Sequence, residues 1–252
     1  MTDRLAALHD SVDRLAGLVG ALDPEQLTVS AYPTEWTIAD TLSHLGSGAV
    51  IFLRRLDDGL AGVETPDDAA EAVWDEWNAK TPRDQTADAL VADRALLDRL
   101  EGLPTEERER VAFDLGPMTF DFDGVVGLRL NEHALHTWDV EVALDPTAVV
   151  ASLPTQSVVD NLQMTVRFSA KPTGTGRTVT VATTDPSRGF AITQGGGQVG
   201  LEPTEPLAAP DLALPAEAFI RLVYGRLDPD HTYGTQGDDG VLGGLRQVFP
   251  GS

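Results

Sequence analysis

The stretch Arg129-Leu-Asn-Glu-His-Ala-Leu-His-Thr-Trp-Asp139 lies in the last helix predicted for the first half of the chain, over residues 124–144. Glu132 and His136 are four residues apart, so their side chains lie one above the other on one helix face. Arg129 and Asp139, each three residues further out, share that face. A carboxylate and an imidazole at this spacing can chelate one divalent ion if a facing helix supplies a third ligand. The stretch therefore predicts a helical fold and, on one of its faces, a candidate metal site.

The third ligand is expected to be His44, in the stretch Thr37-Ile-Ala-Asp-Thr-Leu-Ser-His-Leu45. Thr37 is expected to cap the N-terminus of a helix, with Asp40 completing a capping box in which Asp replaces the usual Glu. This helix is predicted to run to about residue 60. The two stretches together supply two imidazoles and one carboxylate.

Each of these features also has a simpler interpretation. Glu–His pairs four apart are common on solvated helices, and an isolated histidine is often a hydrogen-bonded residue beside a core. Gly46 and Gly48 follow His44 directly, although a glycine inside a helix costs about 1 kcal/mol relative to alanine. They allow either close helix packing or room for a ligand beside His44. His133 is expected to serve packing or to lie at the surface.

The first part of the chain is predicted to be helical. Apolar residues recur at spacings of three and four between residues 3 and 22. A further helix is expected from Thr65-Pro66 to Pro82, and Pro82 is expected to separate it from the next helix, over 86–103. A short hairpin is expected around Gly116-Pro117. The pattern predicts an N-terminal antiparallel four-helix bundle over residues 1–148.

The remaining residues, 149–252, are expected to form a smaller α/β domain, and the composition changes near residues 146–155. Residues alternate at period two in Val166-Arg-Phe168, Val179-Thr-Val181 and Phe190-Ala-Ile192, which predicts three strands. Gly and Pro cluster between these runs. Helices are expected over 215–224 and 240–248. The predicted fold class is thus an α-helical bundle followed by an α/β domain.

Composition excludes several kinds of partner and chemistry. The 252 residues include 40 acidic and 18 basic side chains, for a formal charge of −22. Such an excess would repel the phosphates of nucleic acids and anionic membrane surfaces. The chain has no Cys, so it offers no disulfide, Fe–S cluster or thiol nucleophile of its own. Without a signal peptide or an apolar span, a soluble, cytoplasmic monomer or homodimer is expected.

The two quoted stretches resemble the motifs of a known enzyme family. Trp36 through Leu45 is similar to a Trp-x-x-x-(Asp)-x-x-x-His-Leu signature of the DinB-like metalloenzyme superfamily. Arg129-x-x-Glu132-x-x-x-His136-x-x-Asp139 resembles the second signature of its mycothiol-dependent branch, which includes maleylpyruvate isomerase and mycothiol S-transferases. The resemblance covers nearly the whole chain, because that branch joins a four-helix bundle to a smaller α/β domain. It departs at position 35, where Glu replaces a common glycine outside the ligands.

The resemblance implies a zinc site formed by His44, Glu132 and His136, with a fourth position for water or a thiol. Nickel, iron or manganese would also suit these ligands. The metal would hold mycothiol, the small-molecule cosubstrate, as a thiolate. That thiolate would attack an electrophilic substrate, either in S-transfer or in cis–trans isomerisation.

Further roles follow from the same resemblance. Asp139 is expected to fix the tautomer of His136, with Asp40 a weaker candidate beside His44. Arg226 would bind a substrate carboxylate as a catalytic group, or else only interact with the carbonyls at the C-terminus of a helix. Trp36 and Arg129, with Tyr32, would line the thiol pocket or belong to the core packing. Two alternatives remain open at this point. One is a non-catalytic, metal-containing protein that binds a small ligand, and the other is a hydrolase that needs no thiol.

Overall fold

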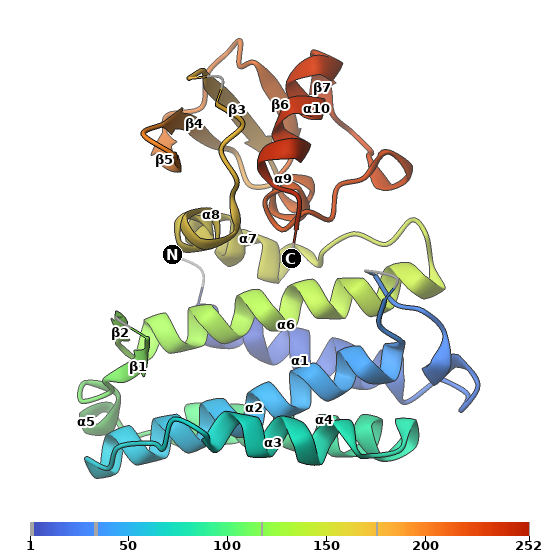
Figure 1. The fold of residues 1–252 in the computed structure, drawn as a ribbon, viewed down its shortest axis with the longest axis vertical. Coiled ribbons are helices and arrows are strands. Elements are labelled where there is room, and N and C mark those ends of the chain that lie inside the picture. Colours follow the sequence, from blue (N-terminus) through green and yellow to red (C-terminus); the bar gives the residue numbers. More distant parts are fainter. Residues whose placement is uncertain (1–2, 33–34, 117, 175, 252) are drawn as a thin grey trace. The chain divides into compact units, whose positions relative to one another are not determined.

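The computed structural model describes residues 3–32, 35–116, 118–174 and 176–251. The chain divides into two compact units, of which the first ends at Asp145 and the second begins at Pro146. The first unit is mainly helical, and the second combines a sheet with short helices (Figure 1). The predicted mixture of helical and sheet structure is thus observed.

Four long helices in the first unit pack against one another (Figure 1). Helix α2 packs against α4 and α6, and α1 also packs against α4 and α6. Apolar side chains from these helices form its core, among them Leu15, Ile38, Leu42 and Val140. The elements of the unit are α1 (Arg4–Val19), the 3-10 turn Gln26–Thr28, α2 (Ile38–Ala61), α3 (Ala69–Asn78), α4 (Pro82–Gly102), α5 (Thr105–Arg108), β1 (Phe113–Leu115), β2 (Met118–Phe120) and α6 (Phe122–Leu144).

Two helix starts differ from the predicted ones. Helix α3 begins at Ala69, about one turn after the expected Thr65-Pro66 start. Helix α4 begins at Pro82 itself, and Pro82 therefore opens this helix instead of separating it from the one before. Thr81 caps its N-terminus, and proline suits the first helical position because its missing N–H would be unpaired there anyway.

The predicted hairpin is also present. Strands β1 and β2 pair antiparallel, with Phe113 opposite Phe120 and Leu115 opposite Met118. Pro117, which was part of this prediction, lies outside the described residues. Along the described part of the chain, none of the helices combines the length and apolarity that crossing a bilayer would require.

The second unit is built on a five-stranded sheet with strand order β5-β4-β3-β6-β7. Its β3–β6 pair is parallel and the other pairs are antiparallel. Val179 lies opposite Ile192, and Val181 opposite Phe190, so the predicted alternation of the second and third runs is confirmed. The elements are α7 (Ser152–Val158), the 3-10 turn Val159–Asn161, α8 (Leu162–Ser169), β3 (Thr178–Thr184), β4 (Arg188–Gly195), β5 (Gln198–Thr204), β6 (Leu212–Pro215), α9 (Ala216–Val223), the 3-10 turn Pro229–His231, β7 (Gln236–Gly237) and α10 (Asp239–Val248).

The strand predicted at Val166-Arg-Phe168 is wrong, because these residues belong to helix α8. In a strand, Val166 and Phe168 would share one face. Here Val166 is buried with Leu162, four residues before it, whereas Phe168 is 62% exposed. The apolar spacing of four therefore decides the element, and two apolar residues at spacing two were too short a run to identify a strand.

Candidate metal centre

Helix α2 places His44 two turns from a firmly capped N-terminus. The Thr37 side chain accepts a hydrogen bond from the Asp40 backbone N–H, while the Asp40 carboxylate accepts one from the Thr37 N–H, so the predicted capping box is present. Leu42 and Leu45 are fully buried on the core face. The His44 side chain remains 40% exposed at the edge of that face.

Helix α6 supplies the other two candidate ligands. Asp121 caps its N-terminus by accepting a hydrogen bond from Gly124. Most of the helix between residues 125 and 142 is buried. Glu132 is an exception, with a side chain that is 44% exposed, whereas the side chain of His136 is 11% exposed. A buried helix thus presents one accessible carboxylate directly beside an anchored imidazole.

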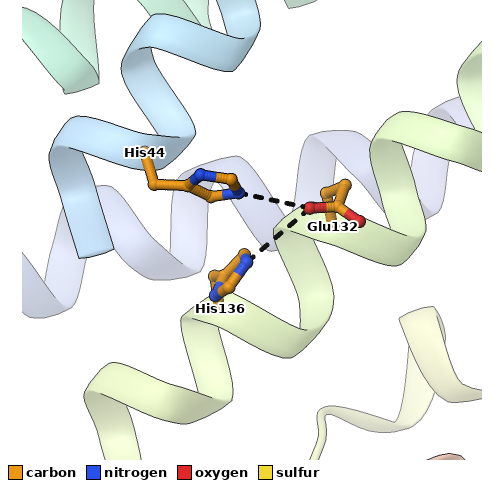
Figure 2. A group of neighbouring side chains, drawn as sticks. All are labelled: His44, Glu132 and His136. Atoms are coloured by element: carbon orange, nitrogen blue, oxygen red, sulfur yellow. Dashed lines mark hydrogen bonds and ion pairs between the residues drawn. The ribbon is translucent and has the colours of Figure 1, made fainter. Parts of the chain in front are cut away.

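The three side chains converge, as Figure 2 shows. Glu132 Oε2 lies 3.4 Å from His44 Nε2 and 3.6 Å from His136 Nε2. One ligand atom from each residue lies within 4.8 Å of the others. Two ligands of a tetrahedral zinc ion, each about 2.0–2.1 Å from the metal, are about 3.3–3.4 Å apart. The two distances to Glu132 are therefore close to those between ligands of one small divalent ion, and the three residues together could hold such an ion.

Their electrostatics favour the ionised carboxylate. Partial desolvation opposes ionisation of Glu132, but hydrogen bonds with His136 and His44 outweigh it and hold the pKa of this carboxyl well below its usual range. Burial opposes protonation of His136, yet Asp139 and Glu132 together raise its pKa. The carboxylate is consequently charged at neutral pH, as a metal ligand must be.

Asp139 contacts the His136 ring at Nδ1, the nitrogen that does not face Glu132. Its Oδ2 lies 2.8 Å from His136 Nδ1, and its side chain is fully buried. In the neutral ring, a proton on Nδ1 is donated to this carboxylate, so the lone pair of Nε2 is available to a metal ion. Asp40 differs, since its described contacts are those of the capping box with Thr37.

An aromatic side chain borders the two imidazoles. The ring of Trp36 lies 5.1 Å from that of His44 and 6.1 Å from that of His136, nearly parallel to the latter. Trp36 is 37% exposed. Tyr32 packs edge-on against Trp138, and its backbone N–H donates to the Asp139 carbonyl. Trp36 therefore lies beside both candidate imidazole ligands, whereas these contacts of Tyr32 hold it against α6.

Arg129 is buried between helices, and its predicted place in the thiol pocket stays a prediction. Its side chain is 3% exposed, forms an ion pair with Asp93 of α4, and donates from Nη2 to the Leu45 carbonyl at 2.9 Å.

The two glycines after His44 serve packing. A Cβ on Gly46 would meet the Trp77 ring at 2.3 Å, and one on Gly48 would lie 3.2 Å from Arg129 Nη1.

Asp93 is a residue that the sequence analysis missed. It lies in the buried stripe of α4 with Ala89, Leu96 and Leu100. The sequence could have indicated its role, because Asp93 is a charged residue at a core position of an amphipathic helix. Such a residue is buried only with a partner. His133 lies beside it, with Nε2 3.4 Å from Asp93 Oδ2, and is fully buried, as the packing interpretation required.

Arg226 belongs to the second unit and is 8% exposed. Its Nη1 donates to the Tyr224 carbonyl at 3.0 Å. This contact anchors the end of α9 and is the kind of interaction that arginines commonly make with the last carbonyls of a helix. Binding of a substrate carboxylate by Arg226 stays a prediction.

Comparisons with known proteins bear on this arrangement. The family model described as mycothiol maleylpyruvate isomerase N-terminal domain matches residues 8–141. The fold is similar to a crystal structure of the mycothiol-dependent maleylpyruvate isomerase, with a TM-score of 0.64 and 13% identity over 88% of each chain. A crystal structure of a histidine-to-alanine mutant of the mycothiol-dependent maleylpyruvate isomerase gives a TM-score of 0.64 and 12% identity over 88% of each chain. At these identities the two structures establish a shared fold. A search of curated proteins gave no match.

Proposed function

Because the chain belongs to the mycothiol maleylpyruvate isomerase N-terminal domain family, we propose that it is a zinc-dependent enzyme with mycothiol as its cosubstrate. In this proposal His44, Glu132 and His136 hold the metal within a DinB-like antiparallel four-helix bundle. The sulfur is transferred to an electrophilic substrate, or adds to it reversibly. The observation that carries the proposal is the convergence of two imidazole nitrogens and a carboxylate oxygen within 4.8 Å.

A bound zinc ion would supply the positive charge that lowers the pKa of an incoming thiol and stabilises its thiolate form. The chain contains no Cys, so the sulfur nucleophile must come from a small molecule. Three protein ligands are typical of catalytic zinc sites, since structural sites usually have four. The exposed edges of His44 and Glu132 leave the ligand set accessible, while Asp139 keeps His136 in place.

Two outcomes share this chemistry. In an isomerase, the thiolate sulfur forms a bond to one carbon of a cis double bond while the π electron pair moves onto a conjugated electron-withdrawing group. After rotation about the carbon–carbon bond, return of the electron pair restores the double bond, breaks the C–S bond and releases the thiolate. In a transferase, the C–S bond persists in the product, which takes up a proton if the sulfur added to a double bond or loses a leaving group if the sulfur displaced one. Both need the same polarised sulfur.

The decisive experiment measures the zinc content of the purified protein and its consumption of mycothiol in the presence of a generic electrophile. Wild type is expected to contain about one zinc per chain, and His44→Ala to lose both metal and activity. His9→Ala is the matched control, because His9 lies on the exposed side of α1. A metal-free His44→Ala variant that consumes thiol at the wild-type rate would rule out the site.

The same assay separates the alternatives. Substrate turnover that is equally fast without any thiol would favour the hydrolase. Stoichiometric metal without thiol consumption would favour a binding protein.

Trp36 gives a second readout. Cobalt bound beside His44 and His136 should quench its fluorescence, and the chain has four Trp in all. Trp36→Phe should remove most of that cobalt-dependent change while the variant still binds cobalt.

A further inference from the structure

A buried charged pair crosses the interior of the first unit beside the candidate metal centre. Asp93 of α4 and Arg129 of α6 are each 3% exposed and form an ion pair. Burial opposes ionisation of Asp93, but the neighbouring Arg129 and His133 lower its pKa, so the carboxylate stays charged. A buried pair of this kind often adds no more stability than apolar side chains of similar size would, so its presence calls for another explanation.

The pair reaches the helix that carries His44. Arg129 Nη2 donates to the carbonyl of Leu45, the residue directly after His44. On its own helix, Arg129 lies one turn before Glu132. Gly48 provides the space, because a Cβ at this position would lie 3.2 Å from Arg129 Nη1. One guanidinium therefore connects the backbone of α2, beside one ligand, with α6, beside the other two.

His133 joins the pair to a fourth helix. Its Nδ1 lies 2.8 Å from the hydroxyl of Ser11 on α1, and its Nε2 lies 3.4 Å from Asp93 Oδ2. Asp93 of α4 thus faces two side chains of α6, since its Oδ1 accepts a hydrogen bond from Arg129 Nη2 and its Oδ2 lies beside His133, which Ser11 of α1 contacts in turn. A planar guanidinium held in this way makes directional hydrogen bonds, which a flexible ammonium cannot reproduce.

We propose that Arg129 and Asp93 are positioning residues for the metal ligands. Arg129 fixes the distance of His44 from Glu132 and His136 by holding the Leu45 carbonyl, and Asp93 orients the Arg129 guanidinium. The inference rests on the proposed metal site. It is separate from the predicted role of Arg129 in lining the thiol pocket.

The test compares zinc affinity, measured on the folded full-length protein by competition with a chromogenic chelator. The double variant Asp93→Val/Arg129→Met replaces the pair by apolar side chains, so that no buried charge is left alone. We expect its zinc dissociation constant to rise about 10–100-fold, the range typical of groups that support metal ligands. The cobalt absorption spectrum should change with it, because ligand geometry changes. Glu141→Gln is the control, since it removes the ion pair of α6 with Arg14 of α1 and leaves the Asp93–Arg129 pair in place.

Each result has a definite meaning. A folded double variant that binds zinc as wild type does would overturn the positioning role. If the double variant does not fold, Arg129→Lys decides, because lysine keeps the charge beside Asp93 without the fork. The zinc affinity of Arg129→Lys should be lower than that of wild type, and an unchanged zinc affinity contradicts the inference. Absence of zinc binding by wild type itself would instead contradict the proposed function.

Discussion

The carboxylate of Asp139 is the side chain on which the orientation of His136 depends. Asp139→Asn removes the charged group whose Oδ2 lies 2.8 Å from His136 Nδ1 and accepts its hydrogen bond. The basicity of His136 Nε2 should decrease as a result. We expect zinc affinity to fall about 10–100-fold with little change in fold. Competition with a chelator measures this.

Asp40→Asn is the matched control. Asp40 lies one turn from His44, but its carboxylate is engaged in the capping box with Thr37. This variant should lose some stability and keep its zinc affinity. An equal loss of affinity in both variants would contradict a specific role for Asp139.

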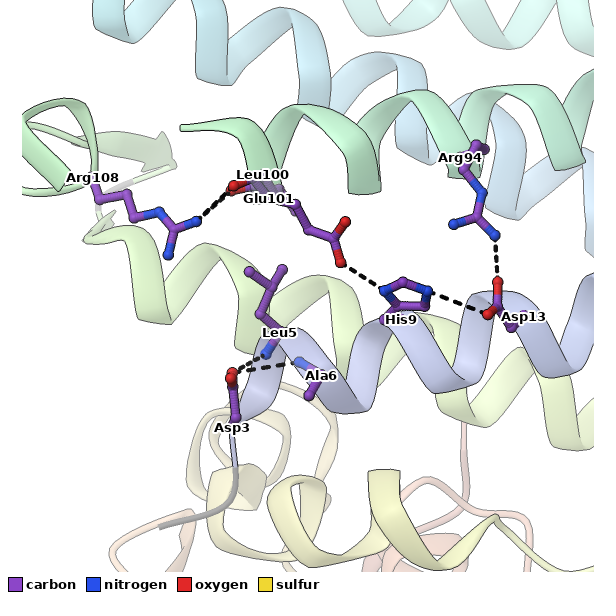
Figure 3. Close-up of polar contacts among 9 residues, drawn as sticks. All are labelled: Asp3, Leu5, Ala6, His9, Asp13, Arg94, Leu100, Glu101 and Arg108. Atoms are coloured by element: carbon purple, nitrogen blue, oxygen red, sulfur yellow. Dashed lines mark hydrogen bonds and ion pairs between the residues drawn. The ribbon is translucent and has the colours of Figure 1, made fainter. Parts of the chain in front are cut away.

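A second residue-scale prediction concerns His9, which joins α1 to α4 (Figure 3). His9 Nδ1 lies 2.7 Å from Glu101, and this hydrogen bond raises the pKa of His9. The stabilisation is therefore fully present below the unfolded-state pKa of about 6.5, and it disappears as the pH rises through the folded-state pKa.

His9→Gln should accordingly reduce the free energy of unfolding by about 0.5 kcal/mol at pH 5.5, a value typical of exposed ion pairs, and by almost nothing at pH 9. Urea denaturation at the two pH values measures the difference. An NMR titration that places the pKa of His9 at or below 6.5 would refute the explanation.

At the scale of elements, the approach of α2 to its neighbours depends on Gly46. A Cβ there would lie 2.3 Å from the Trp77 ring and 2.7 Å from the Ala89 Cα. Gly46→Ala should therefore destabilise the protein by about 1–3 kcal/mol, because overpacking exceeds the gain of about 1 kcal/mol in helix propensity.

Gly17→Ala in α1 is the matched control, since a Cβ at this position would have no neighbour within 4 Å among the described residues. It should stabilise the protein by up to about 1 kcal/mol. Opposite signs in denaturant titrations are expected, and stabilisation by both substitutions would contradict the close packing of α2.

The long helices of the first unit were predicted from local patterns, whereas the short helices α5, α7 and α8 were not. Spacings of three and four in α1 and the Thr37–Asp40 capping box lie close together in sequence, so local physics decides them. The strand predicted at Val166–Phe168 was wrong because two apolar residues at spacing two do not distinguish a strand from a helix. Burial of Val166 with Leu162 decides that α8 is helical.

At the scale of the whole molecule, metal binding should stabilise the fold. A ligand that binds only the native state adds RT ln(1 + [L]/Kd), or about 2.7 kcal/mol at a hundred times Kd. Zinc should therefore raise the melting temperature of wild type, and a chelator should reverse the shift. His136→Ala should show no such response to zinc, and an equal response would show that the stabilising ion binds elsewhere.

The net charge of −22 leads to a prediction for salt. With 40 acidic and 18 basic side chains, acidic groups are in large excess, and their repulsion opposes the compact state. Sodium chloride at about 0.3 M should raise the melting temperature relative to low salt, because screening weakens this repulsion. Sucrose of equal osmolality is the control for effects other than screening.

The sequence by itself determined the family and the three candidate ligands. Glu132 and His136 are four apart on one helix, and such a spacing specifies a shared face whatever surrounds it. The resemblance carried by these motifs is confirmed by the family model over residues 8–141. Asp139, three residues from His136, was likewise placed correctly beside it.

Only the tertiary structure decided which partner each buried charge has. Arg129 and Asp93 are 36 residues apart in sequence, and no local pattern relates them. Gly48 makes room for the Arg129 guanidinium, a role that depends on a helix far along the chain. Long-range packing determines such contacts, because burial forces a charge to find a partner but leaves the choice of partner to the fold.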